Sequence, residues 1–283
     1  MKPLDAPLLP PGVSRVDVVA LRGGQVQTQP DWLADEVPVS LVFNGIAHAV
    51  MLATPGDLED FALGFALTEG LLRSRAELYG IEVREQPLGI EVQLEVSSAA
   101  AWRLRSRRRN LAGRTGCGLC GTEQLAEVRR ELPPAPALQV SLAAMARAQR
   151  ELRAHQALQQ LTGAAHAAAW CRADGSVKLV REDVGRHNAL DKLVGALVKA
   201  GLPAGEGFVC ITSRASFEMV QKTAAAGIGV LAAVSAPTRL AVDTAERLGV
   251  ALAGFVRGDD AVAYAHAGRL CASPFEETVR HGH

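Results

Sequence analysis

Hydrophobic and polar residues in the first third of the chain predict a small sheet and one helix. The run VPVSLVFNGIAHAVML predicts two strands joined at Asn44-Gly45, a dipeptide typical of two-residue hairpins. The next run, TPGDLEDFALGFALTEGLL, predicts a helix with Thr54 as its N-cap and Pro55 at its first position. The core-facing stripe of this helix comprises Leu58, Phe61, Ala62 and Phe65. Because GIEVREQPLGIEVQLEV adds further strand, the pattern predicts an α+β unit.

A different pattern begins after the proline-rich segment PPAPA (133–137), which marks the predicted domain boundary. The Ala- and Arg-rich stretch from Leu142 to Leu161 predicts one long helix. Four short apolar runs then alternate with helix-forming segments: VKLVRE, GFVCITS, GVLAAVS and ALAGFVRG. This alternation is typical of a mostly parallel sheet flanked by helices. The sequence therefore predicts a smaller N-terminal α+β domain over residues 1–135 and an α/β domain over residues 136–283.

Composition narrows the class of protein. The chain has 283 residues, of which 48% are hydrophobic, enough for two folded domains. Its formal net charge is zero, so overall charge gives no reason to expect nucleic-acid binding. Apolar segments are too short for a signal peptide or a membrane span, and we expect a cytoplasmic protein with no membrane partner. The odd number of cysteines, five, argues against a disulfide framework.

Polar residues cluster directly after each predicted strand of the second domain. Carboxyl ends of parallel strands share one sheet edge, so these residues are expected to line a common crevice. Helix N-termini in the same loops favour phosphate, and guanidinium groups suit pyrophosphate. The candidates are Asp183, Arg186, Ser213, Arg214, Ser216, Ser235, Thr238, Arg239, Arg257, Asp259 and Asp260. Each could serve only as a helix cap, but the four loops together favour a phosphate-containing ligand. The G-x-G-x-x-G and P-loop motifs are absent, so an ordinary dinucleotide or nucleoside triphosphate site is not supported.

One Cys-x-x-Cys pair, Cys117 and Cys120, lies between glycines directly after an arginine-rich segment. Three chemistries are open to it. Structural zinc needs four ligands, and a thioredoxin-like disulfide needs an apolar strand leading into the motif; neither is evident. Nearby arginines and a following helix N-terminus favour a reactive thiolate, as a carrier of persulfide sulfur requires. The arginines upstream are Arg103, Arg105, Arg107, Arg108, Arg109 and Arg114.

Collinear motifs along nearly the whole chain resemble the FdhD family of formate dehydrogenase accessory sulfurtransferases. They include TPGDLEDFALGFALTEG, RTGCGLCG, HAAAW, REDVGRHNALDKLVG, SRASFEMVQK, GIGVLAAVSAPTRLAVDTAERLG and LAGFVRG. The resemblance implies that a cysteine desulfurase loads a persulfide onto Cys117, with Cys120 as its partner. Sulfur would then pass to the bis-molybdopterin guanine dinucleotide cofactor (molybdenum or tungsten) before insertion into the formate dehydrogenase catalytic subunit.

The same resemblance implies a homodimer and a second domain similar in fold to cytidine deaminases. It also implies a cofactor-binding stretch that comprises Phe255, Val256, Arg257, Gly258, Asp259 and Asp260. Arg214, Ser216 and Arg239 are the further candidates for binding this cofactor, from the loop pattern described above.

A deaminase-like scaffold raises the alternative of a zinc hydrolase, whose signature is H-x-E followed by P-C-x-x-C. Glutamate does not follow at the required position after any of five histidines: His48, His155, His166, His187 and His266. Gly116, not proline, precedes Cys117. We therefore expect neither deaminase chemistry nor a tightly bound structural metal, and His166 and His187 are candidates for ligand contact. The remaining alternative is a non-catalytic chaperone for the molybdenum cofactor, with a structural Cys-x-x-Cys loop.

Overall fold

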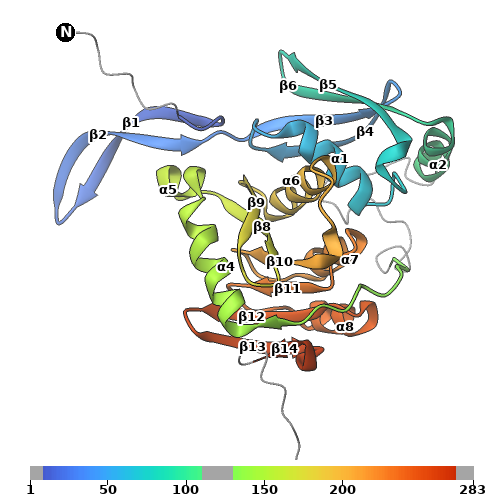
Figure 1. The fold of residues 1–283 in the computed structure, drawn as a ribbon. Helices are drawn as coiled ribbons and strands as arrows, with labels where there is room; N and C mark the ends of the chain where they lie inside the picture. The colour runs from blue at the N-terminus through green and yellow to red at the C-terminus, as the bar shows by residue number, and fades with distance from the viewer. Residues whose placement is uncertain (1–8, 110–129, 272–283) are drawn as a thin grey trace, which may run out of the picture.

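Two sheets organise the chain, one in each half (Figure 1). The computed structural model describes residues 9–109 and 130–271. The N-terminal sheet has the strand order β4-β3-β6-β5. Its strands are β3 (Val37–Phe43), β4 (Ile46–Ala53), β5 (Leu78–Gln86) and β6 (Gly89–Val96). The predicted hairpin is confirmed, because β3 and β4 pair in antiparallel fashion and both Asn44 and Gly45 have positive φ.

A two-stranded ribbon, not predicted from the sequence, precedes this sheet. It consists of β1 (Val13–Arg22) and β2 (Gln25–Ala34), joined by Gly23 and Gly24. Figure 1 shows the ribbon reaching away from the body, and its base packs where β2 contacts α5 (Ala157–Thr162). Most of both faces is exposed, so the ribbon lacks the one-sided hydrophobic pattern that identifies a half-buried strand.

Helix α1 (Leu58–Thr68) packs against the N-terminal sheet, and its predicted apolar stripe is buried at Leu58, Phe61 and Ala62. The predicted N-cap is wrong. The capping position belongs to Asp57, which adopts a left-handed backbone, and Thr54 lies outside the helix. Thr54 is instead buried and hydrogen-bonded to Asp183 in the other half of the chain, so a long-range contact takes the place of a local cap. The short η1 (Arg75–Glu77) and α2 (Ser98–Arg109) complete this half.

The C-terminal sheet has the strand order β13-β12-β11-β10-β8-β9. Its strands are β8 (His166–Arg172), β9 (Val177–Asp183), β10 (Gly207–Ile211), β11 (Val230–Ala233), β12 (Ala251–Arg257) and β13 (Asp260–Ala265). The prediction of a mostly parallel sheet is wrong in part. Strands β10, β11 and β12 are parallel neighbours, whereas β8, β9 and β13 join through antiparallel pairs. Strand β8, Ala-rich and not predicted, inserts between β9 and β10. The fold class is mixed α/β.

Helices cover both faces of this sheet. Three of them pack on one face, around Trp170 and Leu231: α6 (Arg186–Lys199), α7 (Phe217–Ala225) and α8 (Arg239–Leu248). Helix α4 (Leu142–Ala154) packs on the other face, against Phe208. Short elements complete this half: β7 (Val140–Ser141), β14 (Leu270–Cys271), η2 (Ala204–Glu206) and η3 (Ala267–Arg269). Across the described ranges, no helix has both the length and the apolar character needed to cross a membrane.

The single long helix predicted from Leu142 to Leu161 is two helices, α4 and α5. The break has a tertiary cause. Glu182 on β9 accepts hydrogen bonds from the N–H groups of Leu158 and Gln159, at 2.9 and 3.0 Å, and so provides α5 with its own start. The sequence pattern is continuous here because the interruption comes from a strand outside the helix.

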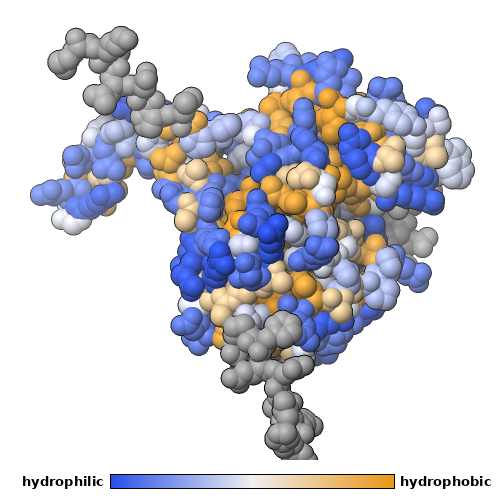
Figure 2. All heavy atoms as spheres, in the orientation of Figure 1, coloured by the Kyte–Doolittle hydropathy of each residue, from blue (hydrophilic) through white to orange (hydrophobic). Residues whose placement is uncertain are grey.

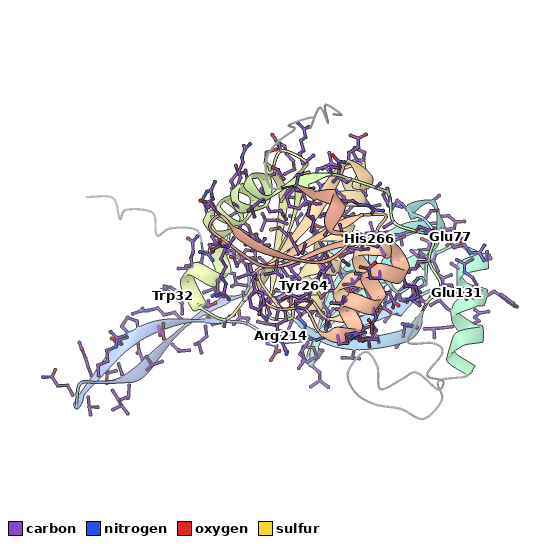
Figure 3. The ribbon with its side chains drawn as sticks, turned by 90° about the horizontal axis from the view of Figure 1, so that it is seen from below. Trp32, Glu77, Glu131, Arg214, Tyr264 and His266 are labelled. Atoms are coloured by element: carbon purple, nitrogen blue, oxygen red, sulfur yellow. The ribbon has the colours of Figure 1, made fainter. Side chains whose placement is uncertain are left out.

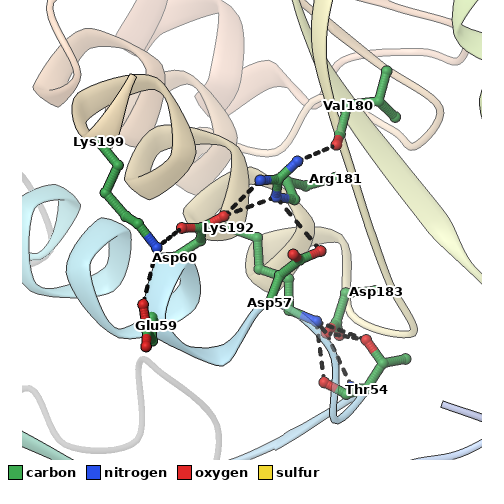
Figure 4. A network of polar contacts seen from close by, with 9 residues as sticks. All are labelled: Thr54, Asp57, Glu59, Asp60, Val180, Arg181, Asp183, Lys192 and Lys199. Atoms are coloured by element: carbon green, nitrogen blue, oxygen red, sulfur yellow. Dashed lines mark hydrogen bonds and ion pairs between the residues drawn. The ribbon is translucent and has the colours of Figure 1, made fainter. Parts of the chain in front are cut away.

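The two halves meet where α1 crosses α6. Gly64 and Gly195 lie at the crossing, and a Cβ atom on either would overlap backbone of the facing helix. Beside the crossing, the fully buried Lys192 lies 2.7 Å from a carboxylate oxygen of Asp183 and donates to the hydroxyl of Thr54 at 2.7 Å (Figure 4). Buried charges and close backbone packing thus join elements that lie far apart in the sequence.

A second buried lysine also links the two halves of the chain near the α1–α6 crossing. Lys222 of α7 pairs with Asp191 of α6 at 2.9 Å and with Glu69, just after α1, at 2.6 Å. At the other end of the crossing, Asp60 of α1 pairs with Arg181 of β9 at 2.7 Å (Figure 4). The C-terminal sheet and the α1 unit are therefore held by three separate sets of charged contacts.

Candidate functional site

The C-terminal ends of four strands open onto one edge of the larger sheet. Strands β10, β11 and β12 are parallel, and β9 runs the same way because the antiparallel β8 separates it from β10. Backbone hydrogen bonds join the loops at this edge. The N–H of Thr238 donates to the carbonyl of Ala215, and the N–H of Phe255 donates to the carbonyl of Ser235. The loops predicted to share a crevice do lie at one edge.

Two helices begin at this edge without a side-chain cap. Helix α6 starts at Arg186 after Gly185, which has no side chain to offer, and α7 starts after Ser216, whose hydroxyl makes no capping bond. Helix α8 differs, because the hydroxyl of Thr238 accepts a bond from Ala241. Early N–H groups of an uncapped helix attract anions, and the helix dipole adds to this attraction. The junction between α6 and α7 is thus suited to negative charge.

At this junction the buried side-chain atoms Arg186 Nε and Ser216 Oγ have no hydrogen-bond partner among the described residues. Leaving a buried polar group unpaired costs roughly 1–3 kcal/mol, so folded proteins contain few of them. A guanidinium donates hydrogen bonds in a fixed fork and a hydroxyl donates one, and both suit the oxygens of an anion. The two unpaired donors therefore favour an oxyanion as the group that contacts them.

A histidine–glutamate pair adjoins the unpaired donors. His187 Nε2 of α6 lies 2.8 Å from Glu218 Oε2 of α7. This contact with His187 holds the pKa of Glu218 below its ordinary value, and the carboxylate is charged at neutral pH. Burial lowers the pKa of His166, at the start of β8, and the charges of Arg186 and His187 add to the effect. His166 is therefore neutral at pH 7.

The predicted cofactor-binding stretch, residues 255–260, forms the end of β12 and its turn into β13. Phe255 is 41% exposed and has a φ of 52°, a strained backbone for an aromatic residue and one that often marks functional sites. Val256 is buried in the core against α4, so only its backbone can face a ligand. Arg257 Nε donates to the carbonyl of Val234 at 3.2 Å. The exposed residues of the turn are Gly258, Asp259 and Asp260.

The other predicted binding residues lie on neighbouring loops of the same edge. Arg214 and Ser216 belong to the loop after β10, where Arg214 is exposed. Arg239 stands in the first turn of α8, with a largely exposed side chain that pairs with Asp243 at 2.8 Å. The structure thus brings the predicted residues to one edge, while their part in binding a cofactor stays a prediction.

Comparison with known proteins identifies the family. Residues 34–271 match the FdhD/NarQ family. The chain belongs to the FdhD/NarQ family. It is 61% identical over 271 residues to the sulfur carrier protein FdhD of Variovorax paradoxus, covering 95% of this chain and 98% of that protein. It is 57% identical over 272 residues to the sulfur carrier protein FdhD of Bordetella petrii, covering 93% and 98% of the two chains.

A solved structure supports the fold. A protein from Desulfotalea psychrophila, assigned as a formate dehydrogenase accessory protein, aligns with a TM-score of 0.74 over 92% of this chain and 100% of its own. Sequence identity to it is 23%, so this likeness concerns the fold alone. The FdhD family membership predicted from the sequence motifs is confirmed.

The cysteines predicted to carry sulfur in this FdhD/NarQ family member, Cys117 and Cys120, lie outside the described residues. The chain on either side is described. Arg103 in α2 pairs with Glu77 at 2.5 Å. On the other side, the N–H of Arg130 donates to Gln221 Oε1 at 3.2 Å, and its guanidinium donates to the carbonyl of Thr68. Figure 3 shows Glu77 and Glu131 on the same side of the molecule, so both flanks of the cysteine segment lie there.

The three cysteines that are described are free thiols. Burial raises the pKa of Cys210 to about 12 and raises that of Cys171 further, so neither forms a thiolate near neutral pH. Both are core residues, whereas Cys271 is half-buried in β14. Within residues 9–109 and 130–271, the structure places no group of three or more His, Cys, Asp or Glu side chains where it could hold a metal ion.

One predicted ligand residue has a structural role, and one residue of the junction was missed. Asp183 is fully buried, and its carboxylate accepts hydrogen bonds from Thr54, Gly185 and Asn188 in addition to pairing with Lys192. It has no face left for a base or a ribose. Glu218 was not among the predicted residues, since an acidic residue in the first turn of a helix ordinarily means only a favourable helix start.

Proposed function

We propose that this protein is a sulfurtransferase that acts in the maturation of formate dehydrogenase. It takes persulfide sulfur from a cysteine desulfurase and transfers it to the bis-molybdopterin guanine dinucleotide cofactor, its substrate, which carries molybdenum or tungsten. Similarity over nearly the full length to proteins named sulfur carrier protein FdhD supports the proposal that this protein carries sulfur. The observation that supports cofactor binding is the pair of buried donors, Arg186 Nε and Ser216 Oγ, which have no hydrogen-bond partner among the described residues.

The sheet edge where β9, β10, β11 and β12 end suits the guanine dinucleotide portion of this substrate. A pyrophosphate group fits the uncapped starts of α6 and α7, where Arg186 and Ser216 supply donors. Arg214 and Arg257 are exposed nearby and add positive charge. The exposed ring of Phe255 offers a surface on which a purine base can stack. Residues of three loops thus divide the recognition of phosphate and base.

In the proposed sulfur-transfer step, the two cysteines supply both electrons that reduce the outer persulfide sulfur to hydrosulfide. A cysteine desulfurase leaves Cys117 as a persulfide. The thiolate of Cys120 then attacks the Cys117 sulfur, the persulfide S–S bond breaks, and the outer sulfur leaves as hydrosulfide. The pair ends as a disulfide, which an external dithiol must reduce. Hydrosulfide replaces an oxygen ligand of the metal, and with one proton that oxygen leaves as water.

Arg130, the first described residue after the cysteine segment, contacts α7, the helix at whose start the proposed phosphate site lies. Cys120 precedes Arg130 by ten residues, and ten fully extended residues span at most roughly 36 Å. Arg130 is bonded to Gln221 in α7, the helix that starts after Ser216. Delivery within one chain or across a homodimer is compatible with this length. We further propose a cytoplasmic location, the formate dehydrogenase catalytic subunit as the recipient, and a cytidine-deaminase-like fold for the α/β half.

Mass spectrometry of the intact protein tests the carrier step. The protein is incubated with a cysteine desulfurase and cysteine, without reductant, and wild type is compared with Cys117→Ala and Cys120→Ala. We expect wild type to gain sulfur in a form that dithiothreitol removes, and Cys117→Ala to gain none. Equal sulfur loading on Cys117→Ala would refute the role of that residue.

Binding of GDP, measured by calorimetry, tests the acceptor site separately. Arg186→Gln and Ser216→Ala should each weaken binding at least about fivefold, because each removes a donor to phosphate. Arg150→Gln, which changes an exposed arginine of α4, is the matched control and should bind like wild type. If GDP binds and the wild-type protein gains no sulfur, the alternative of a non-catalytic cofactor chaperone replaces the sulfurtransferase proposal.

A further inference from the structure

The β1–β2 ribbon carries a surface that its own chain does not cover. Near the tip, Val19, Leu21 and Val26 are 62, 75 and 71% exposed. The ribbon projects from the body in Figures 1 and 2, and Figure 3 shows Trp32 at its base beside the body. A two-stranded hairpin is at best marginally stable alone in water, and further strands or a packing partner stabilise it. The ribbon also precedes almost all of the segment, residues 34–271, that matches the family.

The turn of the ribbon determines which backbone groups face outward. Gly23 and Gly24 form a two-residue turn closed by the pair Arg22 and Gln25, which makes this a hydrogen-bonded pair. Along β1, every second residue therefore bonds to β2, and the residues between turn their N–H and C=O groups outward. The outward set of β1 comprises Val13, Arg15, Asp17, Val19 and Leu21.

The two outer edges of the ribbon differ. On β2 the outward set includes Pro30, which has no N–H and so blunts that edge against strand addition. On β1 every outward residue has both a backbone N–H donor and a backbone C=O acceptor, because none of them is proline. Among the described residues, no strand other than β2 pairs with β1. The edge of β1 is therefore open to another strand.

Charges on the open edge make it complementary to itself. Arg15 and Asp17 are exposed, and neither forms an ion pair with any described residue. If two copies of β1 pair in antiparallel fashion about a two-fold axis at Val16, Arg15 of each copy lies opposite Asp17 of the other. Val13 then lies opposite Val19. An axis at Asp17 would instead place two aspartates opposite each other, which is unfavourable. One register is thus preferred by charge.

We propose that the open edge of β1 pairs with β1 of a second copy of this chain, which gives a four-stranded antiparallel sheet shared by two subunits. Such a contact is isologous, since the same residues serve on both sides. This inference goes beyond the proposed function and is independent of sulfur transfer. A ribbon–ribbon contact is small beside stable interfaces, which bury roughly 1,200 Å² or more, so a concentration-dependent equilibrium of monomer and dimer is expected.

Sedimentation velocity of the full chain, with reductant present to exclude disulfides between copies, tests the proposal from about 1 to 200 μM. Wild type should shift from monomer to dimer over this range. Arg15→Asp places aspartates opposite each other twice and should raise the dimer dissociation constant about tenfold or more. The double variant Arg15→Asp, Asp17→Arg restores both opposite-charge pairs and should recover most of the wild-type affinity.

A matched pair of proline variants tests which edge is used. Val19→Pro removes an outward N–H of β1 and should abolish the dimer. Thr28→Pro, opposite Val19 in the ribbon, removes an outward N–H on the β2 edge and should leave the dimer intact. A dimeric wild type with every variant equally dimeric would overturn this interface while leaving a homodimer in place. A wild type that stays monomeric at 200 μM would overturn both, and sulfur loading of the monomer would be unaffected.

Discussion

Replacing Lys192 by methionine removes the only positive charge that directly contacts the buried carboxylate of Asp183 among the described residues. Lys192 is fully buried, and its ammonium contacts three oxygens: Asp183 Oδ2 at 2.7 Å, Thr54 Oγ1 at 2.7 Å and the Thr54 carbonyl at 3.1 Å. Methionine fills a similar volume without donating a hydrogen bond. The variant therefore leaves the buried carboxylate of Asp183 without its counterion.

The magnitude follows from burial. Removing one partner of a buried ion pair costs about 3–5 kcal/mol, against a total stability of about 5–15 kcal/mol for a folded domain. Four remaining hydrogen bonds to Asp183, from Thr54, Gly185 and Asn188, favour the lower part of this range. A loss of about 3 kcal/mol corresponds to a fall in Tm of roughly 6–12 °C for a chain of this size.

Urea denaturation followed by circular dichroism at pH 7.5 measures the change in the free energy of unfolding. Lys199→Met is the matched control, because Lys199 lies on the same helix and pairs with Asp60 at 2.8 Å but is 42% exposed. It should lose no more than about 1 kcal/mol. Adding Asp183→Asn to Lys192→Met should recover about 1 kcal/mol or more, because no unpaired charge remains. A loss below about 1 kcal/mol for Lys192→Met would show that the buried ion pair contributes little to stability.

Three further outcomes are expected. Gly195→Ala should destabilise the fold by at least about 2 kcal/mol in urea, because its Cβ meets backbone of α1, whereas Gly268→Ala, with open space around it, should change stability by less than about 0.5 kcal/mol. In NMR titrations the pKa of His166 should lie below its ordinary value, and Arg186→Gln should move it upward, because a nearby positive charge is removed; no movement would contradict the electrostatic account. Cys210 should stay unmodified by iodoacetamide at pH 8, as judged by peptide mass spectrometry, because burial raises its pKa to about 12. Modification in the folded protein would show that the core opens.

Local sequence patterns predicted the parts of the fold that local physics determines. The Asn44-Gly45 turn was predictable because few dipeptides accept two positive φ values in succession. The shared edge was predictable because β9 to β12 all run the same way, whichever strands are neighbours. Strand β8 was not, because its alanines have no strong strand preference, and its position between β9 and β10 depends on tertiary pairing.

The candidate site shows the same division. Arg214, Ser216 and Arg239 could be assigned to one edge because each follows a strand end. The contact between His187 and Glu218 could not, since it joins two helices about thirty residues apart in the sequence. Thr54 and Asp183 were misjudged for a related reason. Each has the residue type of a cap or a ligand, and only the crossing of α1 with α6 shows that they bond to each other.

The crossing of α1 with α6 also limits when the protein can fold during its synthesis. Helix α1 ends at Thr68, whereas its partner α6 ends at Lys199. At translation rates of about 5–20 residues per second, α1 leaves the ribosome roughly ten seconds before α6 is complete. During that interval the glycine surface of α1 and the polar groups that later contact Lys192 and Lys222 face water or a chaperone, while the apolar stripe of α1 can already pack on the N-terminal sheet. The N-terminal half can therefore form its own core early, but the face of α1 that contacts α6 reaches its native packing only after most of the protein has been made.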